Sequence, residues 1–420
     1  MEYLGYRYLE SLLMFGIKPG LTSTETLCKA LGNPERSFRT IHVVGTNGKG
    51  STSFYLANIL QAHQKNTLLY TSPHLISLSE RIRLNGIPIS KKDLNACLLE
   101  VKEAAENTNI QATYFEALTV AAFLYAKKKN AEYFVAEAGL GGRFDATAVA
   151  KGDFIILTSI GLEHTAILGD TEEKILKEKL GIVKANATCL CGHLKENLIT
   201  EAKRIAEESH WNLQIQNKNI PLELLNSGNH YEENANLSFA LSGMILKEDF
   251  NTEKAKQILK RSLWPGRMQL LHDTSGNLKF ILDGAHNSHA MKRLTETLQK
   301  KFPNKKFHTI FGVLKDKDLS EMLSLLAPNV QEFHLSGTSY ERFSEPEILK
   351  AEIEKRGFKT GLAKNISKEF IRAVQEKAQG ETVLITGSLY LIGACIYLLK
   401  DDFRELDFFK DLEMEANEKH

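Results

Sequence analysis

The sequence has few of the features that mark a membrane protein, a secreted protein or a protein that binds nucleic acid. Five cysteines are scattered over 420 residues, and the one close pair, Cys189 and Cys191, is C-x-C rather than C-x-x-C. This usage indicates reduced thiols in a cytosolic protein. The N-terminus lacks the basic start and apolar core of a signal peptide, and no apolar run is long enough to cross a bilayer. We therefore expect a cytoplasmic protein with no membrane partner.

Neither positive nor negative charge is in excess. Lys and Arg total 53 and Asp and Glu total 52, so there is no global electrostatic reason to expect nucleic acid as a partner. A chain of 420 residues is longer than one hydrophobic core usually serves. Pro265 and Gly266 interrupt the pattern where a predicted helix ends. We expect two domains, residues 1–266 and 267–420.

Short apolar segments alternate with helical periodicity in both predicted domains. Predicted strands cover residues 39–45, 66–71, 132–139 and 153–161, and a second series covers 278–286, 306–313, 330–337 and 381–388. Such alternation is typical of a mostly parallel sheet covered on both faces. The predicted fold class is α/β, with a phosphate-loop ATPase domain at the N-terminus and a smaller Rossmann-like domain at the C-terminus.

The segment VVGTNGKGSTS, residues 43–53, follows a predicted strand and opens a predicted helix. Glycines let backbone N–H groups approach an anion, and the helix N-terminus adds its dipole. Lys49 supplies a positive charge for the outer phosphates of a nucleotide. The alternative, a tight glycine turn that binds nothing, is disfavoured because strand, glycines, lysine, serine and helix occur in the order that the chemistry requires.

Other polar side chains follow predicted strands and so belong at the carboxyl edge of the sheet, where α/β proteins bind ligands. Glu137 is a candidate Mg²⁺ ligand there, with a helix cap and turn as the structural alternative. His164 and Ser72 also follow strands. In the second predicted domain Asp283 and His286 follow the first strand, and Arg267 lies at the predicted hinge, where it could clamp phosphates. Together they indicate an ATP site shared between two domains.

The motifs GTNGKGS, YTSPHL, TYFEALT, EAGLGGRFDAT, WPGR, DGAHN, FGVLKDKD and TGSLYLIG occur in order along nearly the whole chain, after GIKPGL and LGNP near the start. In this series the sequence resembles the folylpolyglutamate synthase and dihydrofolate synthase family of the Mur ligase superfamily. The resemblance implies an ATP-dependent ligase. ATP phosphorylates a carboxylate of dihydropteroate or of a folate tail, and the amine of L-glutamate attacks the acyl phosphate. A monomer is expected.

The resemblance also implies roles for individual residues. The phosphate-loop residues that it assigns to ATP are Thr46, Asn47, Gly48, Lys49, Gly50 and Ser51, and the further nucleotide contacts are Asn234, Arg267 and Asp283. The metal ligands are Ser72, Glu137 and His164. The pterin or folate site includes Thr113, Phe115, Glu116, Phe144 and Asp145. His286 approaches the γ-phosphate, Lys49 is catalytic, and Lys179 aligns with a lysine that the family carbamylates. ATP and Mg²⁺ are the expected cofactors.

The sequence departs from the family pattern at four places. Glu163 replaces the aspartate before His164, Leu180 follows Lys179, Ala148 replaces an asparagine, and Ser288 replaces a proline. These changes make carbamylation of Lys179 less certain, but they remove no metal or phosphate residue. Two alternatives stay open: a Mur-type ligase for another carboxylate, which would usually carry an extra N-terminal domain, and a nucleotide-dependent binding module without catalysis.

Overall fold

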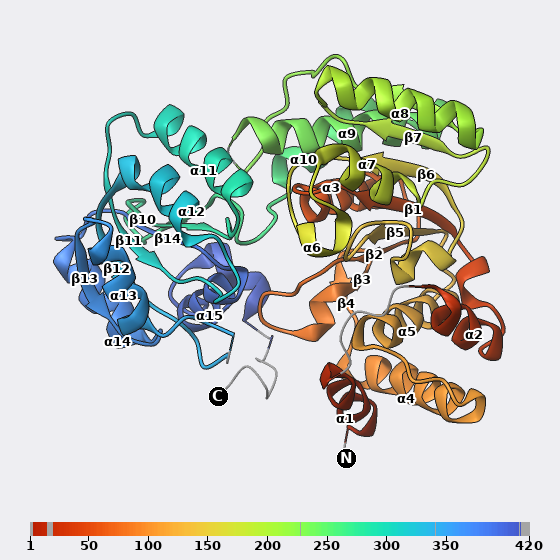
Figure 1. The fold of residues 1–420 in the computed structure, drawn as a ribbon, viewed down its shortest axis with the longest axis horizontal. Helices are drawn as coiled ribbons and strands as arrows, with labels where there is room; N and C mark the ends of the chain where they lie inside the picture. The colour runs from red at the N-terminus through yellow and green to blue at the C-terminus, as the bar shows by residue number, and fades with distance from the viewer. Residues whose placement is uncertain (1–2, 15–19, 227, 341, 411, 413–420) are drawn as a thin grey trace. The chain divides into compact units, whose positions relative to one another are not determined.

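The structure is a computed structural model that describes residues 3–14, 20–226, 228–340, 342–410 and 412. It divides into two compact units, shown in Figure 1. Unit 1 comprises residues 1–72, 79–224 and 231–262, and unit 2 comprises residues 73–78, 225–230 and 263–420. Most of the GIKPG motif, residues 16–20, and the last part of the charged C-terminal tail, residues 413–420, lie outside the described residues.

Unit 1 contains an eight-stranded sheet in the order β4-β3-β2-β5-β1-β6-β7-β8. Its strands are β1 Arg39–Val44, β2 Thr67–Tyr70, β3 Ile82–Leu84, β4 Ile87–Pro88, β5 Tyr133–Glu137, β6 Gly152–Leu157, β7 Thr188–Cys191 and β8 Asn212–Ile215. All neighbouring pairs are parallel except β2–β3 and β3–β4. The central position of β1 places the loop that follows it in the middle of the carboxyl edge.

Helices cover both faces of this sheet. They are α1 Leu4–Ser11, α2 Thr22–Ala30, α3 Lys49–Ala62, α4 Lys91–Thr108, α5 Tyr114–Lys128, α6 Thr165–Leu168, α7 Glu172–Leu180, α8 Glu196–Ser209, α9 Asn229–Leu246 and α10 Thr252–Arg261. The alternation of side chains along β6 separates two cores. Ile155 and Leu157 pack with α7 and α8, whereas Ile156 packs with α3 and α9. A strand buried on both faces reads as a continuous apolar run, as the sequence does here.

Unit 2 contains a six-stranded sheet in the order β13-β12-β11-β14-β10-β9. Its strands are β9 Gln269–His272, β10 Leu278–Asp283, β11 Phe307–Phe311, β12 Val330–Leu335, β13 Thr360–Ala363 and β14 Val383–Thr386. Its helices are α11 Ser288–Lys301, α12 Leu319–Leu326, α13 Pro346–Lys355, α14 Lys368–Lys377 and α15 Leu389–Leu399. Only the β9–β10 pair is antiparallel. The predicted α/β fold class, with two mostly parallel sheets, is confirmed.

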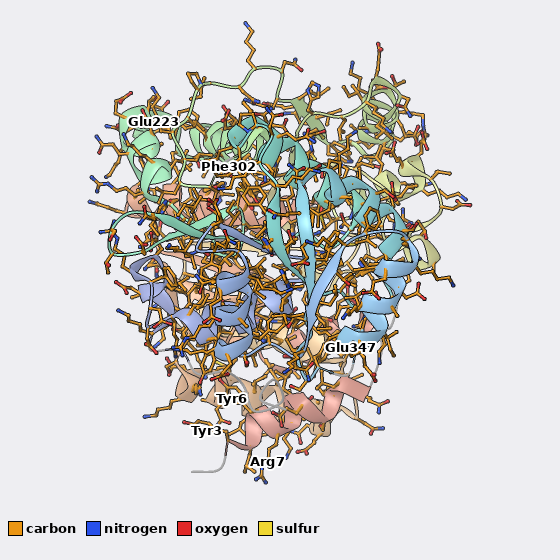
Figure 2. The ribbon with its side chains drawn as sticks, turned by 90° about the vertical axis from the view of Figure 1, so that its left-hand side faces the viewer. Tyr3, Tyr6, Arg7, Glu223, Phe302 and Glu347 are labelled. Atoms are coloured by element: carbon orange, nitrogen blue, oxygen red, sulfur yellow. The ribbon has the colours of Figure 1, made fainter. Side chains whose placement is uncertain are left out.

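The core of unit 2 forms where apolar strand residues meet helices α14 and α15. Leu282, Ile310 and Ile385 pack with Val374 of α14 and Ile396 of α15. Phe302, which follows α11 and is labelled in Figure 2, meets the ring of Phe307 edge-on, with centroids 5.7 Å apart. The apolar segment 387–400 contains α15, which packs in this core. Among the described residues, no helix is long and apolar enough to cross a membrane.

Two short segments belong to unit 2 although the chain on either side of them belongs to unit 1. In the first, residues 73–78, Ile76 is fully buried in the core beside α15. In the second, residues 225–230, the Asn226 side chain donates to the Trp264 carbonyl at 2.9 Å and accepts from the Trp264 N–H at 2.8 Å. The chain therefore passes between the two units five times, and the last passage lies between Ser262 and Leu263.

Candidate active site

The glycine-rich loop of unit 1 joins β1 to α3, as the sequence predicts. Helix α3 begins at Lys49 with Gly48 as its N-cap, so its first N–H groups and its dipole face the loop. Gly48 has φ of 84°, and a Cβ there would lie 2.5 Å from Oδ1 of Asn234. Glycine is therefore required on both conformational and steric grounds. The predicted nucleotide residue Asn234, buried in α9, is thereby placed against the loop.

Hydrogen bonds fix the loop to the segment that follows β6. The Thr46 N–H donates to the Ser159 carbonyl at 2.8 Å, and the Thr46 hydroxyl donates to the Gly161 carbonyl at 3.0 Å. The Asn47 N–H donates to Oγ of Ser159 at 3.1 Å, and Thr158 donates to the Asn47 carbonyl at 2.7 Å. Ser51 is buried in the first turn of α3. The loop thus holds its shape without a ligand.

Two lysines and one glutamate meet at this loop. Lys49 Nζ donates to the carbonyls of Gly45 at 2.9 Å and Thr46 at 3.1 Å. Lys179 Nζ donates to the same Gly45 carbonyl at 2.9 Å and to Oε1 of Glu163 at 2.6 Å. A lysine in the middle of a helix is usually solvated. The side chain of Lys179 is instead only 1% exposed. The Gly45 carbonyl therefore joins the phosphate loop to α7.

Burial and charge shift the pKa values of this cluster. Burial, followed by the nearby Lys49 charge, lowers the pKa of Lys179 to about 8, although Glu163 acts to raise it. Burial acts to raise the pKa of Glu163, but Lys49 and Lys179 outweigh it, so that pKa is lowered. A lysine with a pKa near 8 carries a substantial fraction of neutral, nucleophilic amine at physiological pH. Glu163 was not among the predicted site residues, although it follows β6 beside His164.

Strand register brings the predicted metal ligand Glu137 to the same edge. Glu137 pairs with Val43, two residues before Gly45, and its carboxylate is buried. The Ser72 N–H donates to Oε2 of Glu137 at 3.0 Å, so these two predicted ligands are in contact. His164 lies at the start of α6 with φ of 45°, and its side chain is exposed. All three predicted ligands thus follow strands at one edge, with His164 on a different segment.

Two of the predicted substrate residues stabilise a helix. Thr113 and Glu116 form a capping box at the start of α5: the Thr113 N–H donates to Glu116 Oε2 at 2.7 Å, and the Glu116 N–H donates to Thr113 Oγ1 at 3.3 Å. The ring of Phe115, between them, lies against Gly139. The capping bonds explain why Thr113 and Glu116 are present without a ligand, and their role in substrate binding stays a prediction.

Asp145 and Phe144, the other predicted substrate residues, lie in the GLGGRFDAT loop and differ sharply. Asp145 is buried and accepts the N–H groups of Gly139 at 2.8 Å and Leu140 at 3.0 Å. Burial raises its pKa, and these hydrogen bonds, with two more from Thr147, oppose that shift. Phe144 is 52% exposed. Asp145 shapes the loop from within, and Phe144 presents an aromatic face outward.

In unit 2 the predicted residue Asp283 ends β10, and His286 lies just after that strand. Asp283 is buried and accepts the N–H groups of Met268 at 2.8 Å and Ala285 at 2.9 Å. Nδ1 of His286 is 2.8 Å from the Gly284 carbonyl. Because a carbonyl only accepts, this contact puts the imidazole proton on Nδ1 and leaves Nε2 as the basic nitrogen.

Arg267 packs against the same turn. Its Nη1 lies against Gly284, is buried, and has no hydrogen-bond partner within the described part of the chain. Burial, followed by the charges of Arg293, Arg267 and His289, lowers the pKa of His230 to about 3. A buried cation without an acceptor is costly unless an anion joins it. Sequence reasoning missed His230 and Arg293, because only the fold brings them near Arg267.

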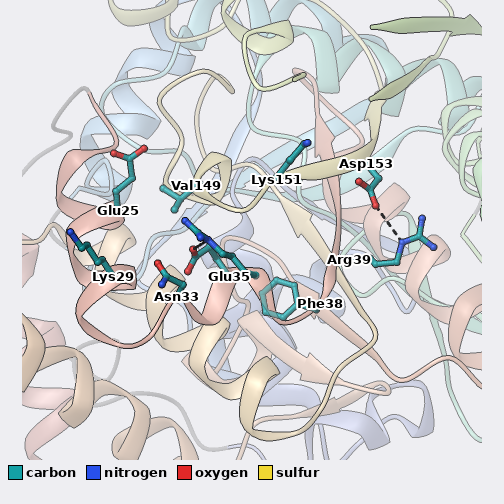
Figure 3. Close-up of a pocket in the computed structure, with 10 residues that line it drawn as sticks. Glu25, Lys29, Asn33, Glu35, Phe38, Arg39, Val149, Lys151 and Asp153 are labelled. Carbon is teal, nitrogen blue, oxygen red and sulfur yellow. Dashed lines mark hydrogen bonds and ion pairs between the residues drawn. The ribbon is translucent and has the colours of Figure 1, made fainter. Parts of the chain in front are cut away.

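Hollows occur at opposite ends of the two sheets. One hollow, of about 640 Å³, lies in unit 1. Its lining includes the ion pair between Arg39 and Asp153, 3.3 Å long and drawn as a dashed line in Figure 3. Arg39 begins β1 and Asp153 lies near the start of β6, so this hollow is at the amino edge, away from the phosphate loop. A hollow of about 580 Å³ in unit 2 follows β11 and β12, at the carboxyl edge. It is lined by Lys315, Thr338, Ser339, Tyr340, Phe343, Ser344, Glu345, Pro346, Glu347 and Asn365.

Both units match models of known domains. Residues 43–244 match the Mur ligase middle domain, and residues 266–389 match the Mur ligase glutamate ligase domain. The phosphate loop after β1 and the Arg267–His286 turn fall within these two matches. The fold and site therefore define a ligase of the Mur type.

Similar proteins narrow this class. A dihydrofolate synthase/folylpolyglutamate synthase of Bacillus subtilis is 34% identical, over 92% of this chain and 96% of the relative. A probable dihydrofolate synthetase of Schizosaccharomyces pombe is 32% identical, over 92% of this chain and 99% of the relative. The structure of Escherichia coli FolC in complex with DHPP and ADP superposes with a TM-score of 0.82, at 25% identity, covering 96% of this chain and 98% of that one.

The chain belongs to the dihydrofolate synthase/folylpolyglutamate synthase family. The resemblance found in the sequence motifs is thereby confirmed, and so is the enzyme class that it implied, an ATP-dependent acid–amino-acid ligase. The roles of the individual site residues remain predictions.

Proposed function

We propose that this protein joins L-glutamate by an amide bond to the carboxyl group of dihydropteroate, to the glutamate tail of folates, or to both, at the expense of ATP. The observation that carries the proposal is the carboxyl edge of unit 1. There the phosphate loop with Lys49 follows β1, Glu137 ends β5 beside Ser72, and Lys179 of α7 donates to the Gly45 carbonyl. Family membership supports the same reaction, because the Bacillus subtilis relative carries both activities in its name.

Lys49 has a direct part in this chemistry. Its ammonium group donates to two loop carbonyls. The phosphates of ATP are stronger acceptors than neutral carbonyls, so the ammonium group turns to them when ATP binds. There it neutralises the charge that spreads over the γ-phosphoryl oxygens during transfer. Lys179 keeps the Gly45 carbonyl occupied when Lys49 leaves it.

The residues present fit a magnesium ion. Mg²⁺ prefers oxygen ligands, and a buried carboxylate beside a serine at the edge of the phosphate loop provides that chemistry. We propose that Glu137 and Ser72 hold the ion that accompanies ATP, with His164 as a further ligand. Such an ion would offset charge on the β- and γ-phosphates. Carbamylation of Lys179 belongs to this proposal too: the lowered pKa supplies the neutral amine that reacts with CO₂.

Unit 2 would contribute the remaining charges, consistent with its match to a glutamate ligase domain. We propose that residues 267–420 form this domain and residues 1–266 the ATP-binding domain. Arg267, with its buried Nη1, suits an anionic oxygen of the nucleotide, and His286 offers Nε2 to the transferring phosphoryl group.

The reaction then proceeds in two balanced steps. The acceptor carboxylate attacks the γ-phosphorus, the bond to the β-phosphate oxygen breaks, and ADP leaves. The glutamate ammonium group first loses a proton to solvent, and the neutral amine attacks the carbonyl carbon of the acyl phosphate. The nitrogen releases a second proton as the tetrahedral adduct collapses. Inorganic phosphate leaves with the bonding electrons, and an amide remains. Phosphorylation is needed because an unmodified carboxylate has a very poor leaving group.

The test uses the purified protein with ATP, Mg²⁺ and L-glutamate. One reaction contains 7,8-dihydropteroate and a second contains tetrahydrofolate, and both are followed by ADP release and product mass. A gain of one glutamyl residue in both reactions establishes a bifunctional enzyme. A gain in one reaction names its acceptor. No ADP in either reaction overturns the proposal and favours another carboxylate acceptor, or a binding module without catalysis.

A further inference from the structure

Three potential metal ligands converge on the sheet of unit 2, apart from every residue assigned to the reaction. His308 lies in β11, and Glu332 and His334 lie in β12. The strands are parallel, with His308 opposite Glu332 and Ile310 opposite His334. Because register partners share a face, all three side chains project to the side covered by α14 and α15. His334 is fully buried, and the side chains of the other two residues are at most 10% exposed.

We propose that His308, Glu332 and His334 bind a divalent transition-metal ion, with Zn²⁺ as the best fit. The ligand atoms His308 Nδ1 and His334 Nε2 are 3.0 Å apart, and Glu332 Oε2 lies 3.6 Å and 3.5 Å from them. Four ligands about 2.0–2.2 Å from a tetrahedral zinc ion are separated from one another by about 3.3–3.6 Å. The two separations from Glu332 match edges of such a tetrahedron, and the two nitrogens would have to move apart by about 0.3 Å or more. Two imidazoles with one carboxylate form a recognised zinc donor set.

The chemical state of the cluster is suited to a metal. Burial lowers the pKa of both histidines, to about 4 for His334, although Glu332 acts to raise both values. Burial acts to raise the pKa of Glu332, but neighbouring lysine and histidine charges outweigh it, so the carboxylate is ionised. A metal ion would offset the negative charge of Glu332, which Lys359 and Lys377 balance in this structure.

Binding has two identifiable costs. The Leu362 N–H donates to His334 Nδ1 at 3.2 Å, which puts the His334 proton on Nε2, facing His308. A metal at Nε2 moves that proton to Nδ1 and breaks the Leu362 bond, which lies on the edge strand β13. The second cost is the loss of two ion pairs, because Lys359 and Lys377 lie 3.4 Å and 3.5 Å from the Glu332 oxygens. Their exposed side chains can swing into solvent and open a path to the cluster.

The site would act as a clamp between β11 and β12 rather than in catalysis. A ligand that binds only the folded state stabilises it in proportion to the logarithm of its concentration over Kd. Zn²⁺ would therefore raise the melting temperature of the protein without changing the ligase rate. The cluster would also account for a pair of buried histidines in the sheet that the proposed reaction does not use.

The experiment uses the full-length protein, freed of metal by a chelator and kept in excess Mg²⁺. Zn²⁺ is titrated by calorimetry, and Co²⁺ is used for its tetrahedral absorption bands. His308→Gln and Glu332→Gln keep similar size and should each weaken binding at least about tenfold. His272→Gln is the matched control, because His272 pairs with Glu405 at 3.1 Å elsewhere in the same unit. That variant should bind as the parent does.

A second variant works in the opposite direction and does not depend on losing a function. Lys359→Met removes an ammonium group that competes with the metal for Glu332, so Zn²⁺ should bind several-fold more tightly. Ligase activity should stay unchanged in all four variants. The proposal is overturned if Co²⁺ gives no tetrahedral spectrum, or if His308→Gln and His272→Gln bind zinc equally. Either result would leave a hydrogen-bonded histidine pair only.

Discussion

The turns that follow β1 in unit 1 and β10 in unit 2 both bring positive charge to the carboxyl end of a strand, but they satisfy it differently. In unit 1, Lys49 and Lys179 share the Gly45 carbonyl, and Lys179 also pairs with Glu163. In unit 2, Nη1 of Arg267 has no acceptor among the residues that the structure describes. The first turn holds its cations in a closed network until ATP competes for them. The second is prepared for an anion and unsatisfied without it.

The largest effect should come from removing Lys49, the lysine that we expect to leave the Gly45 carbonyl for the phosphates of ATP. We expect Lys49→Ala to lower kcat about 10³-fold, because transition-state charge on the γ-phosphate loses its nearest cation. The melting temperature should change little, since Lys179 still bonds the Gly45 carbonyl. Steady-state kinetics and thermal unfolding measure the two effects. Lys174→Ala, at an exposed ion pair, is the control, and a collapse of the fold in Lys49→Ala would contradict this view.

On the unit 2 side, His286→Gln should lower kcat about 10²-fold while the Kd of ATP changes less than about threefold. The reason is that Nε2 of His286 is expected to serve the phosphoryl group during transfer and not in the ground state. Single-turnover rates and equilibrium binding of an ATP analogue separate the two quantities. Equal losses in both would assign His286 to ground-state binding, and His272→Gln again serves as the control.

The sharpest test of the comparison is a pair of matched substitutions. Arg267→Met removes a cation without an acceptor at Nη1, so the free energy of unfolding should stay the same or rise, while kcat/KM falls about tenfold or more. Lys179→Met removes the partner of Glu163 and should lower the free energy of unfolding by about 2 kcal/mol. Denaturant unfolding measures both. Similar losses of stability would show that the two turns do not differ in the way described.

The smallest expected effect is a difference between the two units in how far acid lowers the free energy of unfolding. Buried His42 of unit 1 has a pKa lowered to about 4 by burial, and in unit 2 burial lowers His230 to about 3 and His334 to about 4. A lowered pKa stabilises the folded state above the unfolded value of about 6.5, and the benefit is lost as pH falls toward the folded value. Each histidine accounts for roughly 2 kcal/mol at pH 4.5.

Among the described residues, burial lowers the pKa of three histidines in unit 2, His230, His308 and His334, and of one in unit 1, His42, so unit 2 should lose more stability between pH 6.5 and 4.5. Calorimetry over this range would show its transition moving further than that of unit 1. Substituting His42 should flatten the pH dependence of the unit 1 transition alone. If both transitions moved together, the two units would be unfolding as one.

The fold was predictable because its strands are buried on both faces. Segments such as 39–45 and 153–161 are rich in apolar residues and contain most of β1 and β6, and Lys49 begins its helix within the glycine-rich loop. The order of the strands could not be read from the sequence, because it depends on packing between segments far apart in the chain. The assignment of residues 73–78 and 225–230 to unit 2 could not be read from the sequence either, because Leu75 and Ile76 resemble any other apolar pair.

The position of the candidate residues at the carboxyl edge of the sheet was predictable, and their contacts were less so. Strand ends identified Glu137, Ser72 and His164, because carboxyl edges of parallel strands meet. Burial of Lys179 was not predictable, since its position in α7 fits a solvated residue equally well, and only the contact with Gly45 shows otherwise. Thr113, Glu116 and Asp145 show a different limit, because hydrogen bonds within the protein account for their polar atoms and sequence cannot separate that use from ligand binding.

The five passages of the chain between the units have a consequence for how this protein can be divided. A fragment that begins at Leu263 would carry the whole six-stranded sheet but not Ile76, so it would open a gap in the core beside α15. The complementary fragment would expose that isoleucine to water. Neither half is a portable module, and shuffling of such domains between genes would have to carry both pieces of unit 2 along with it.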